Sequence, residues 1–272
     1  MAVMPAPLTL AGAQMRASRL IVAMPKGGSG KTATATALAW GFHRAGRRVL
    51  LVDLDPQGNA TAALGVASGN GYGSLEFLLR PERRFEPVTV APGLDVAPAS
   101  PWAAGVDLEV QKANQLTGPV AVRDALSRVE GLYDLLICDC APSLGPVTYN
   151  ALAAGPVLVP VEMTRLAVSA VPELGRVVST LRRGVAAAAE ILGYLPTRWS
   201  SRLDESREAL RALLTLGGGR VLHSRVPFAT AIAQCMAEAR SPFMARYRRS
   251  KGPVAYLEVL EEVSALLEER HG

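Results

Sequence analysis

The stretch that decides the fold is Lys26-Gly27-Gly28-Ser29-Gly30-Lys31-Thr32. An apolar run over residues 20–24 precedes it and is typical of a buried strand, while residues 32–45 follow with a helical pattern. The glycines allow backbone N–H groups to turn inward, and the start of the helix adds the positive end of its dipole. This order predicts a cradle for a chain of phosphates, with Lys31 on the β- and γ-phosphates and Thr32 on a Mg²⁺ ion.

Lysine usage in the whole chain supports the same interpretation. The chain has four lysines against 25 arginines, and two of the four lie in this loop. A compact ammonium suits a tight phosphate nest better than a planar guanidinium does. The alternative is a glycine-rich turn with two surface lysines, but strand, loop, helix and two lysines together favour a phosphate site.

The composition is that of a globular chain. Its 272 residues are enough for one large α/β domain, and charged residues make up 19%. No apolar run approaches the roughly 20 residues of a membrane-spanning helix. Residues 1–17 lack the pattern of a signal peptide, so we expect a flexible extension, too short for a helix-turn-helix module, before a single domain over residues 18–272. Three cysteines without metal-ligand spacing fit a reducing cytoplasm.

The net charge of +5 is unevenly distributed along the sequence. Residues 1–164 hold 13 basic and 13 acidic side chains, whereas residues 165–251 hold 15 basic and six acidic ones. A basic surface attached to a neutral nucleotide-binding part is what a polyanion-binding protein would have. The alternative is a set of scattered, solvated arginines.

Two further apolar runs end in aspartates. Residues 49–53 form one run, which continues through Asp53 to Asp55, and residues 135–139 form the other, which ends at Asp139. Carboxylates at the carboxyl ends of parallel strands point into the ligand crevice of an α/β sheet. The alternative for Asp53 and Asp55 is a capped turn with solvent-facing carboxylates. More apolar strands are expected at residues 157–162 and 190–197, and amphipathic helices at 165–183, with an interruption near Val171-Pro172, and at 254–269.

These motifs carry a family resemblance. The loop has the form K-G-G-x-G-K-T, residues 53–59 read D-L-D-P-Q-G-N, and residues 139–145 read D-C-A-P-S-L-G, close to the family pattern D-x-P-P-S-L-G. Over about residues 19–268 the sequence resembles the ParA/MinD ATPases with a deviant Walker A loop. The resemblance implies a P-loop NTPase: one α/β domain with a doubly wound, mainly parallel sheet, helices on both faces, ATP and Mg²⁺ as cofactors, and an ATP-dependent homodimer.

The resemblance also implies roles for single residues. Lys26 would reach across the dimer interface to the nucleotide of the partner subunit. Asp55 would position or activate the attacking water, with Asp53 nearer the metal. Asp139, as a Walker B carboxylate, would hold a water of the Mg²⁺ ion. Thr197 and Pro227 would lie on the adenine side.

The same resemblance points to DNA. Residues 197–208 resemble the family segment T-M-Y-D-S-R-T-N-L-S-R-E, in which Arg202 aligns with an arginine often tied to non-specific DNA binding. Arg198 lies nearby. The family motif I-P-R is V-P-F here, with Phe228 in place of the arginine, so the basic load is expected to have moved toward the C-terminal helix. The remaining DNA-contact candidates are Arg248, Arg249 and Lys251.

Together these patterns predict a ParA-type partition ATPase that binds DNA non-specifically as an ATP-bound dimer in the cytoplasm, on the nucleoid, with a ParB-type partner stimulating hydrolysis. One alternative is a positioning ATPase that acts on a membrane or protein cargo, although the acidic outer face of the last helix argues against a membrane. Another is a P-loop ligase or synthetase, which would have no need of Lys26. A non-hydrolysing scaffold is disfavoured by the three aspartates.

Overall fold

The computed structural model describes residues 17–67, 73–100, 106–184, 186, 188–244, 247 and 249–270. The extension predicted at residues 1–17 lies, except for residue 17, outside the described residues and stays a prediction. The strands are β1 (Ser18–Val22), β2 (Val49–Asp53), β3 (Val88–Ala91), β4 (Leu94–Ala97), β5 (Leu135–Asp139), β6 (Pro156–Glu162) and β7 (Glu190–Thr197). The helices are α1 (Lys31–Arg44), α2 (Asn59–Ala63), α3 (Ser74–Leu79), α4 (Val106–Thr117), α5 (Ala121–Ser127), α6 (Pro146–Leu152), α7 (Arg165–Val168), α8 (Val171–Gly184), α9 (Asp204–Gly217), α10 (Thr230–Ala237) and α11 (Lys251–Glu269).

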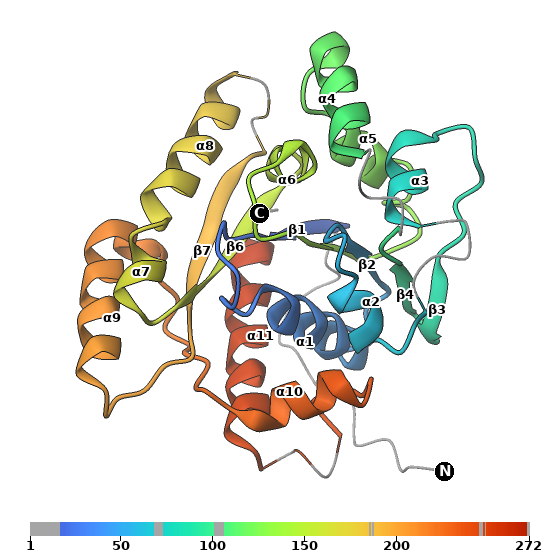
Figure 1. Cartoon of the computed structure of the whole chain (residues 1–272). Helices are drawn as coiled ribbons and strands as arrows, with labels where there is room; N and C mark the ends of the chain where they lie inside the picture. The colour runs from blue at the N-terminus through green and yellow to red at the C-terminus, as the bar shows by residue number, and fades with distance from the viewer. Residues whose placement is uncertain are drawn as a thin grey trace.

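Within the described residues, seven strands form one sheet in the order β3-β4-β2-β5-β1-β6-β7. All neighbouring strands are parallel except β3 and β4, which are antiparallel at one edge. The phosphate-loop strand β1 therefore lies inside the sheet, between β5 and β6 (Figure 1). The carboxyl ends of β1, β2 and β5 meet at one edge, where α/β sheets bind their ligands.

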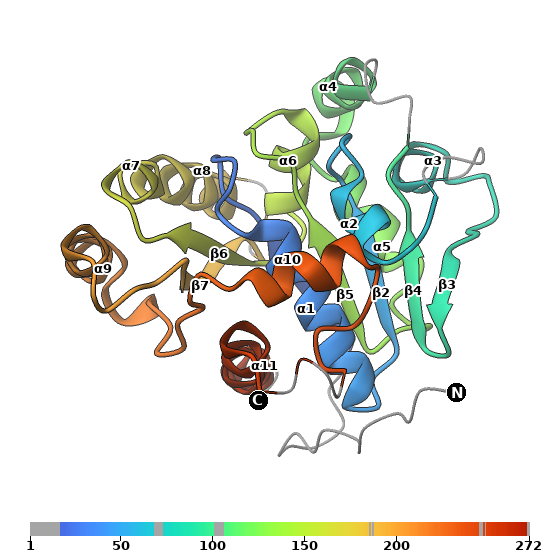
Figure 2. The ribbon, with the colours of Figure 1, turned by 60° about the horizontal axis from the view of Figure 1, so that its bottom comes forward.

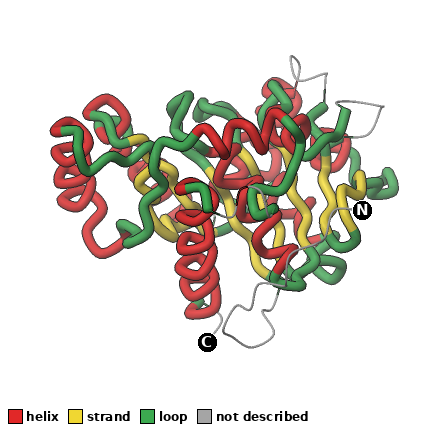
Figure 3. Tube along the Cα trace, turned by 90° about the horizontal axis from the view of Figure 1, so that it is seen from below, coloured by secondary structure: helices red, strands yellow, loops and turns green. Residues whose placement is uncertain are grey.

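Helices cover both faces of the sheet because the strands are apolar on both sides. In β5, Leu135 and Ile137 pack in the core with α1 and α11, whereas Leu136 and Cys138 pack in the core with α5, α6 and α8. Figures 2 and 3 show the strands enclosed between these two helical layers. This confirms the predicted doubly wound, mainly parallel sheet, and the continuous apolar runs reflect burial on both faces.

Several boundaries differ from the sequence-based expectation. The helix expected at residues 165–183 is interrupted as predicted, but the break lies at residues 169–170, between α7 and α8, and Pro172 stands in the first turn of α8. Helix α11 begins at Lys251 rather than at residue 254, because Pro253 lies in its first turn, where the missing N–H would have no helical partner. The edge strand β3 and the helix α10 were not predicted. All three cysteines are buried and reduced.

The phosphate-loop helix α1 is tied to the C-terminal helix α11. The hydroxyls of Thr34 and Tyr256 are hydrogen-bonded at 3.0 Å inside the core. Burial raises the pKa of Tyr256 to about 12, so the phenol stays protonated. Further along α1, a Cβ on Gly41 would come within 2.9 Å of Leu260, so the two helices pack too closely there for a side chain.

We expect the Thr34–Tyr256 pair to be coupled in a double-mutant cycle. Thr34→Val or Tyr256→Phe alone leaves one buried hydroxyl without a partner and should cost about 1–3 kcal/mol, while the double variant should cost less than the sum. The measurement is urea unfolding of the four proteins. Thr180→Val, at an exposed position of α8, is the control and should change stability by less than about 0.5 kcal/mol. Additive single costs would contradict the coupling.

Candidate functional site

The phosphate loop connects β1 to α1 at the carboxyl edge of the sheet. Gly28 and Gly30 have φ angles of +78° and +89°, in the left-handed region that favours glycine. Gly30 occupies the N-cap position of α1, so the loop leads directly into the positive end of the helix dipole. The loop opens into a cleft of about 530 Å³, and its lining residues are Gly27, Gly28, Gly30, Lys31, Thr32, Ala33, Asp55, Gln57, Asn59, Ala62, Ala63, Pro142 and Met236.

The two lysines of the loop have different environments. Lys31 is 6% exposed, and its Nζ donates a hydrogen bond to the carbonyl oxygen of Lys26 at 2.9 Å. Burial lowers the pKa of Lys31, and the carboxylates of Asp139 and Asp55 oppose that shift. Lys26 is partly exposed, and no ion pair is found for its ammonium within the described part of the chain. Its side chain is therefore available to a second molecule.

Asp53 and Asp139 are buried side by side. They are paired residues in the register of β2 and β5, and both are 0% exposed. Burial raises the pKa of Asp53 to about 6, although the hydrogen bonds from Thr61 and Asp55 lower it. Burial and the neighbouring Asp53 raise the pKa of Asp139 well above its usual range, and the Thr32 hydroxyl and Lys31 only partly offset them. Two adjacent carboxylates that are both shielded from solvent cannot stay charged together unless a cation neutralises them or one of them binds a proton.

Asp139 has the property expected of a residue that faces a metal ion. Neither of its carboxylate oxygens makes a hydrogen bond of normal geometry among the described residues, although the Thr32 side chain is close enough to lower the pKa of Asp139. Thr32 stands in the first turn of α1, beside the same edge of the sheet. No group of three or more His, Cys, Asp or Glu side chains forms a self-sufficient metal site in the described ranges. This set fits Mg²⁺, which binds to one or two protein groups together with phosphates and water.

Asp53 has a different environment. Its Oδ2 accepts hydrogen bonds from the Thr61 backbone N–H at 2.8 Å and from the Thr61 hydroxyl at 2.7 Å. The Thr61 hydroxyl oxygen also accepts the backbone N–H of Ala99 at 2.8 Å. Asp53 thus fixes helix α2 to the sheet, and its predicted place near the metal stays a prediction. Nothing in the sequence pattern marks Thr61 for this role.

Asp55 lies at the wall of the cleft, just after β2. Its Oδ1 accepts the backbone N–H of Gln57 at 3.0 Å, which holds the turn that follows. Gln57 and Asn59 also line the cleft. Both belong to the D-L-D-P-Q-G-N motif, so the sequence contained a signal for them that the residue-by-residue prediction did not use.

Thr197 reaches the phosphate loop from the other side of β1. Its hydroxyl donates to the carbonyl oxygen of Ser29 at 2.8 Å. Pro227 lies next to the end of β7, where it forms an isolated parallel bridge with Trp199. Neither Thr197 nor Pro227 is among the lining residues of the cleft, so their predicted adenine contacts stay predictions.

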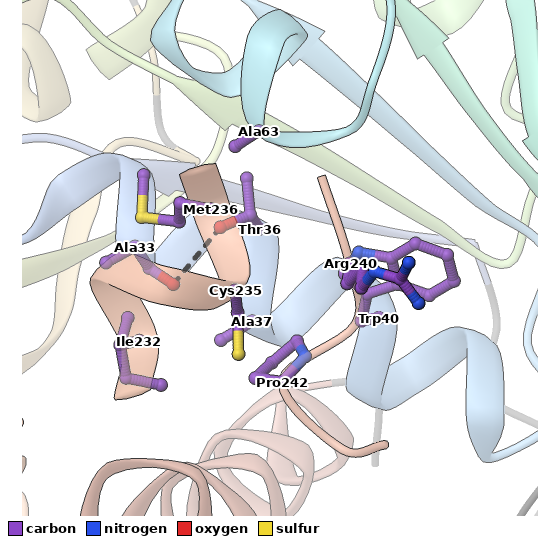
Figure 4. Close-up of a pocket in the computed structure, with 10 residues that line it drawn as sticks. All are labelled: Ala33, Thr36, Ala37, Trp40, Ala63, Ile232, Cys235, Met236, Arg240 and Pro242. Atoms are coloured by element: carbon purple, nitrogen blue, oxygen red, sulfur yellow. Dashed lines mark hydrogen bonds between the residues drawn. The ribbon is translucent and has the colours of Figure 1, made fainter. Parts of the chain in front are cut away.

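Helix α10 supplies a wall of the cleft that the sequence did not predict. A cavity of about 10 Å³ separates it from α1 (Figure 4), and Ala33, Ala63 and Met236 border both this cavity and the cleft. In the close-up, Met236 lies near Ala33 and Thr36 of α1. Met236 therefore joins the site through packing that no sequence motif encodes.

The predicted DNA-contact residues are dispersed over two regions. Arg202 is exposed in the turn before α9, and no carboxylate pairs with its side chain in the described part of the chain. Arg198 is engaged: its Nε lies 3.5 Å from Glu162 Oε1, and its guanidinium stacks on Phe228. Arg249 and Lys251 are exposed at the start of α11, and Arg248 lies outside the described residues.

Among the described residues, no helix has the combination of length and hydropathy needed to cross a bilayer.

Comparison with known proteins identifies the family. The AAA_31 model, described as an AAA domain, matches residues 18–191. The chromosome-partitioning ATPase Soj of Thermus thermophilus is 37% identical over 253 residues, which cover 92% of this chain and 97% of that protein.

Solved structures agree in fold. Cobyrinic acid a,c-diamide synthase from Mycobacterium smegmatis, with bound ADP and magnesium, is 32% identical with a TM-score of 0.77, covering 94% of this chain and 96% of that one. A McdA variant from Cyanothece, in complex with ATP, is 21% identical with a TM-score of 0.81, covering 94% of this chain and 98% of that one. The sheet topology, the phosphate loop with its two lysines and the sequence identity to Soj together establish that this chain belongs to the ParA/Soj family of P-loop ATPases.

Proposed function

We propose that this chain is a partition ATPase whose ATP-bound homodimer holds DNA without reading its sequence and releases it after hydrolysis. The observation that carries the proposal is the pair of lysines in the phosphate loop. Lys31 is buried and its ammonium is hydrogen-bonded to the Lys26 carbonyl, whereas the Lys26 side chain is partly exposed, does not line the cleft and has no ion pair among the described residues. A loop lysine outside the lining of its own cleft would be free to serve the nucleotide of a partner subunit.

The chemistry of the site fits ATP and Mg²⁺. Bound magnesium would neutralise charge on the transferred phosphoryl group. Thr32 and Asp139 are the residues that would hold it, and the oxygens of Asp139, which make no hydrogen bond of normal geometry among the described residues, support that assignment. Asp55 would orient the attacking water from the wall of the cleft, since its Oδ1 is occupied by Gln57 and its second oxygen has no hydrogen bond among the described residues. The relatives crystallised with ADP and magnesium or with ATP support the same ligands here.

Residues 165–251 contain too few acidic side chains to pair with all of their basic ones. Four of the six acidic residues of this segment pair with arginines of the same segment: Glu208 with Arg165, Glu190 with Arg182, Asp204 with Arg207 and Glu238 with Arg240. Since acidic partners are so few, other arginines, with Arg202 as the main candidate, retain their charge for a partner. A dimer would double this surface, so a contact that is weak in one subunit would retain DNA in two.

The remaining parts of the proposal concern partners and location. A DNA-bound protein of the ParB type would stimulate hydrolysis, and nucleoid association in the cytoplasm would follow from DNA binding. The competing function is that of a positioning ATPase that acts on a protein cargo. A relative named cell division protein PomZ, which is 32% identical, supports this alternative. The DNA experiment below separates the two.

We expect Asp139→Asn to abolish the stabilisation that magnesium and ADP give together. An amide cannot replace a carboxylate beside Mg²⁺, so the gain of about 2.7 kcal/mol expected at a ligand concentration of 100 Kd should fall sharply. Thermal unfolding with ADP, with and without magnesium, measures the effect. Asp124→Asn, an exposed carboxylate on α5, is the matched control. An undiminished magnesium effect in Asp139→Asn would remove this residue from the metal site.

Lys26→Ala should separate nucleotide binding from dimerisation. In an Asp55→Ala background, which should trap the ATP-bound dimer, sedimentation with ATP and Mg²⁺ should give a dimer, and adding Lys26→Ala should return a monomer that still binds ATP. Lys112→Ala, at an exposed position of α4, is the control. A dimer that forms equally well without Lys26 would contradict the cross-subunit role.

DNA retention should depend on nucleotide, salt and Arg202. The chain should bind duplex DNA with ATP and lose it with ADP, and Arg202→Ala should weaken binding on all sequences alike. Each side chain that no longer neutralises a DNA phosphate should make the slope of log affinity against log salt shallower by about 0.9, which doubles when both subunits of the dimer lose Arg202. Filter binding across a salt series measures this, with Arg123→Ala on α5 as a charge-matched control. Equal retention in both nucleotide states would contradict the nucleotide-dependent switch, and no retention in either state would favour the protein-cargo function.

A further inference from the structure

Helix α10 lies between the nucleotide cleft and two of the basic residues that are candidates for DNA contact. Its residue Met236 lines the cleft, and the exposed side chains of Arg249 and Lys251 follow the helix along the chain. No described residue within 247–256 lines the cleft. Within one subunit, an effect of the nucleotide on these two basic side chains must therefore pass through the protein, and α10 contacts both regions.

The first contact of α10 with this segment is a small core of its own. Ala231 and Cys235 of α10 pack against Tyr247, and all three residues are buried. The Tyr247 hydroxyl donates a hydrogen bond to Glu238 Oε2 at 3.1 Å, directly after the end of α10. Because Tyr247 stands two residues before Arg249, this contact fixes the chain on one side of the basic pair.

The second contact lies on the other side of the basic pair, at the start of α11. A Cβ on Gly252 would come within 2.7 Å of the Ala229 Cβ and within 2.8 Å of the Ile232 side chain. The first turn of α11 therefore packs directly onto the start of α10, with no room for a side chain between them. Arg249 and Lys251 lie between the two contacts, so the position of their backbone follows that of α10.

The other side of α10 rests on the helix that follows the phosphate loop. Ala33 of α1 and Ala63 of α2 border a cavity of about 10 Å³, which Cys235 and Met236 of α10 close from the opposite side (Figure 4). Small side chains and a residual space allow a packed helix to slide by a small amount. Met236 borders both the cavity and the cleft, so a nucleotide in the cleft would contact the helix at this residue.

The end of α10 has a strained backbone. Ala239 has a φ of 49°, in the left-handed region, which among the described non-glycine residues occurs otherwise only at Arg198. Its methyl group lies against Gly65, just after α2, where an added Cβ would come within 3.1 Å of it. Helix α2 is attached to Asp53 through Thr61, so α10 also touches a second element of the nucleotide site. Strain of this kind persists only where the surroundings determine it, and it is frequent in switch regions.

We propose that α10 transmits the occupancy of the nucleotide cleft to Arg249 and Lys251 and thereby sets their affinity for a polyanion within a single subunit. The identity of the two ligands rests on the proposed function, but this coupling needs no second subunit. Because coupling between two sites is reciprocal, DNA bound at the basic pair would change the affinity for the nucleotide by the same factor. Factors of about 5 to 150 are usual for such coupling.

Hydrogen exchange of the full chain, with and without ADP and Mg²⁺, tests this path without DNA or hydrolysis. Saturating ADP should slow the exchange of residues 247–256 together with that of α10, by at least about fivefold, and leave α9 unchanged. In Met236→Ala, at an ADP concentration that again saturates the cleft, the change at residues 247–256 should disappear. Gln234→Ala, at an exposed position of α10, is the matched control and should behave like the unaltered chain.

Tyr247→Phe tests the far end of the path and replaces Met236→Ala if that variant does not fold. It removes the hydrogen bond to Glu238, so ADP should still slow exchange in α10 but have a smaller effect on residues 247–256. Two results would overturn the proposal. One is ADP that binds without slowing exchange at residues 247–256. The other is a slowing that persists in Met236→Ala or, where that variant does not fold, in Tyr247→Phe.

A DNA measurement separates this inference from the proposed function. In the chain with both Lys26→Ala and Asp55→Ala, which should stay monomeric, ATP should still tighten the binding of a short DNA duplex by at least about fivefold. Adding Met236→Ala should bring this factor close to one. Retention of DNA by the dimer without any effect of ATP on the monomer would overturn this inference alone. Failure of every form of the chain to bind DNA would contradict the proposed function and, with it, the polyanion part of this inference.

Discussion

Two carboxylates, Asp53 and Asp139, are buried side by side at the centre of the sheet, and much of the site follows from keeping them there. Both face a low-dielectric interior in which adjacent negative charges are strongly unfavourable. The two carboxylates differ in their environment: Asp53 accepts two hydrogen bonds from Thr61, whereas the oxygens of Asp139 make no hydrogen bond of normal geometry among the described residues, and only Thr32 and Lys31 lower its pKa. Asp139 would therefore be stabilised by a nearby cation. A nucleotide bound at the adjacent phosphate loop would place its phosphates where they could share that cation.

This asymmetry connects the metal site to the surface. The hydrogen bond between Asp53 and Thr61 fixes α2 to the sheet. The turn from Asp55 to Asn59 connects the end of β2 to the start of that helix. Any change in charge at Asp139 acts on its neighbour Asp53 and, through it, on this turn.

The sequence predicted the parts whose physics is local or periodic. The buried parallel strands, the phosphate loop and the placement of Asp53, Asp55 and Asp139 at one edge follow from apolar runs and glycine spacing, and the structure agrees with them. Thr61 and Met236 could not be predicted, because their contacts depend on how α2 and α10 pack against α1. Helix α10 and strand β3 were missed because their short segments lack a sustained apolar period.

Arg198 and Arg202 illustrate why counting charges along a sequence overestimates a binding surface. The two lie four residues apart, and both were DNA-contact candidates in the sequence. In the structure, Arg198 is stacked on Phe228 and paired with Glu162, so releasing its guanidinium to a phosphate would expose an aromatic ring and an unpaired carboxylate. Arg202 has no such contacts among the described residues and loses only side-chain entropy on binding. Local packing therefore divides the basic excess of residues 165–251 into arginines held by an aromatic ring and a carboxylate and arginines that remain available to a polyanion.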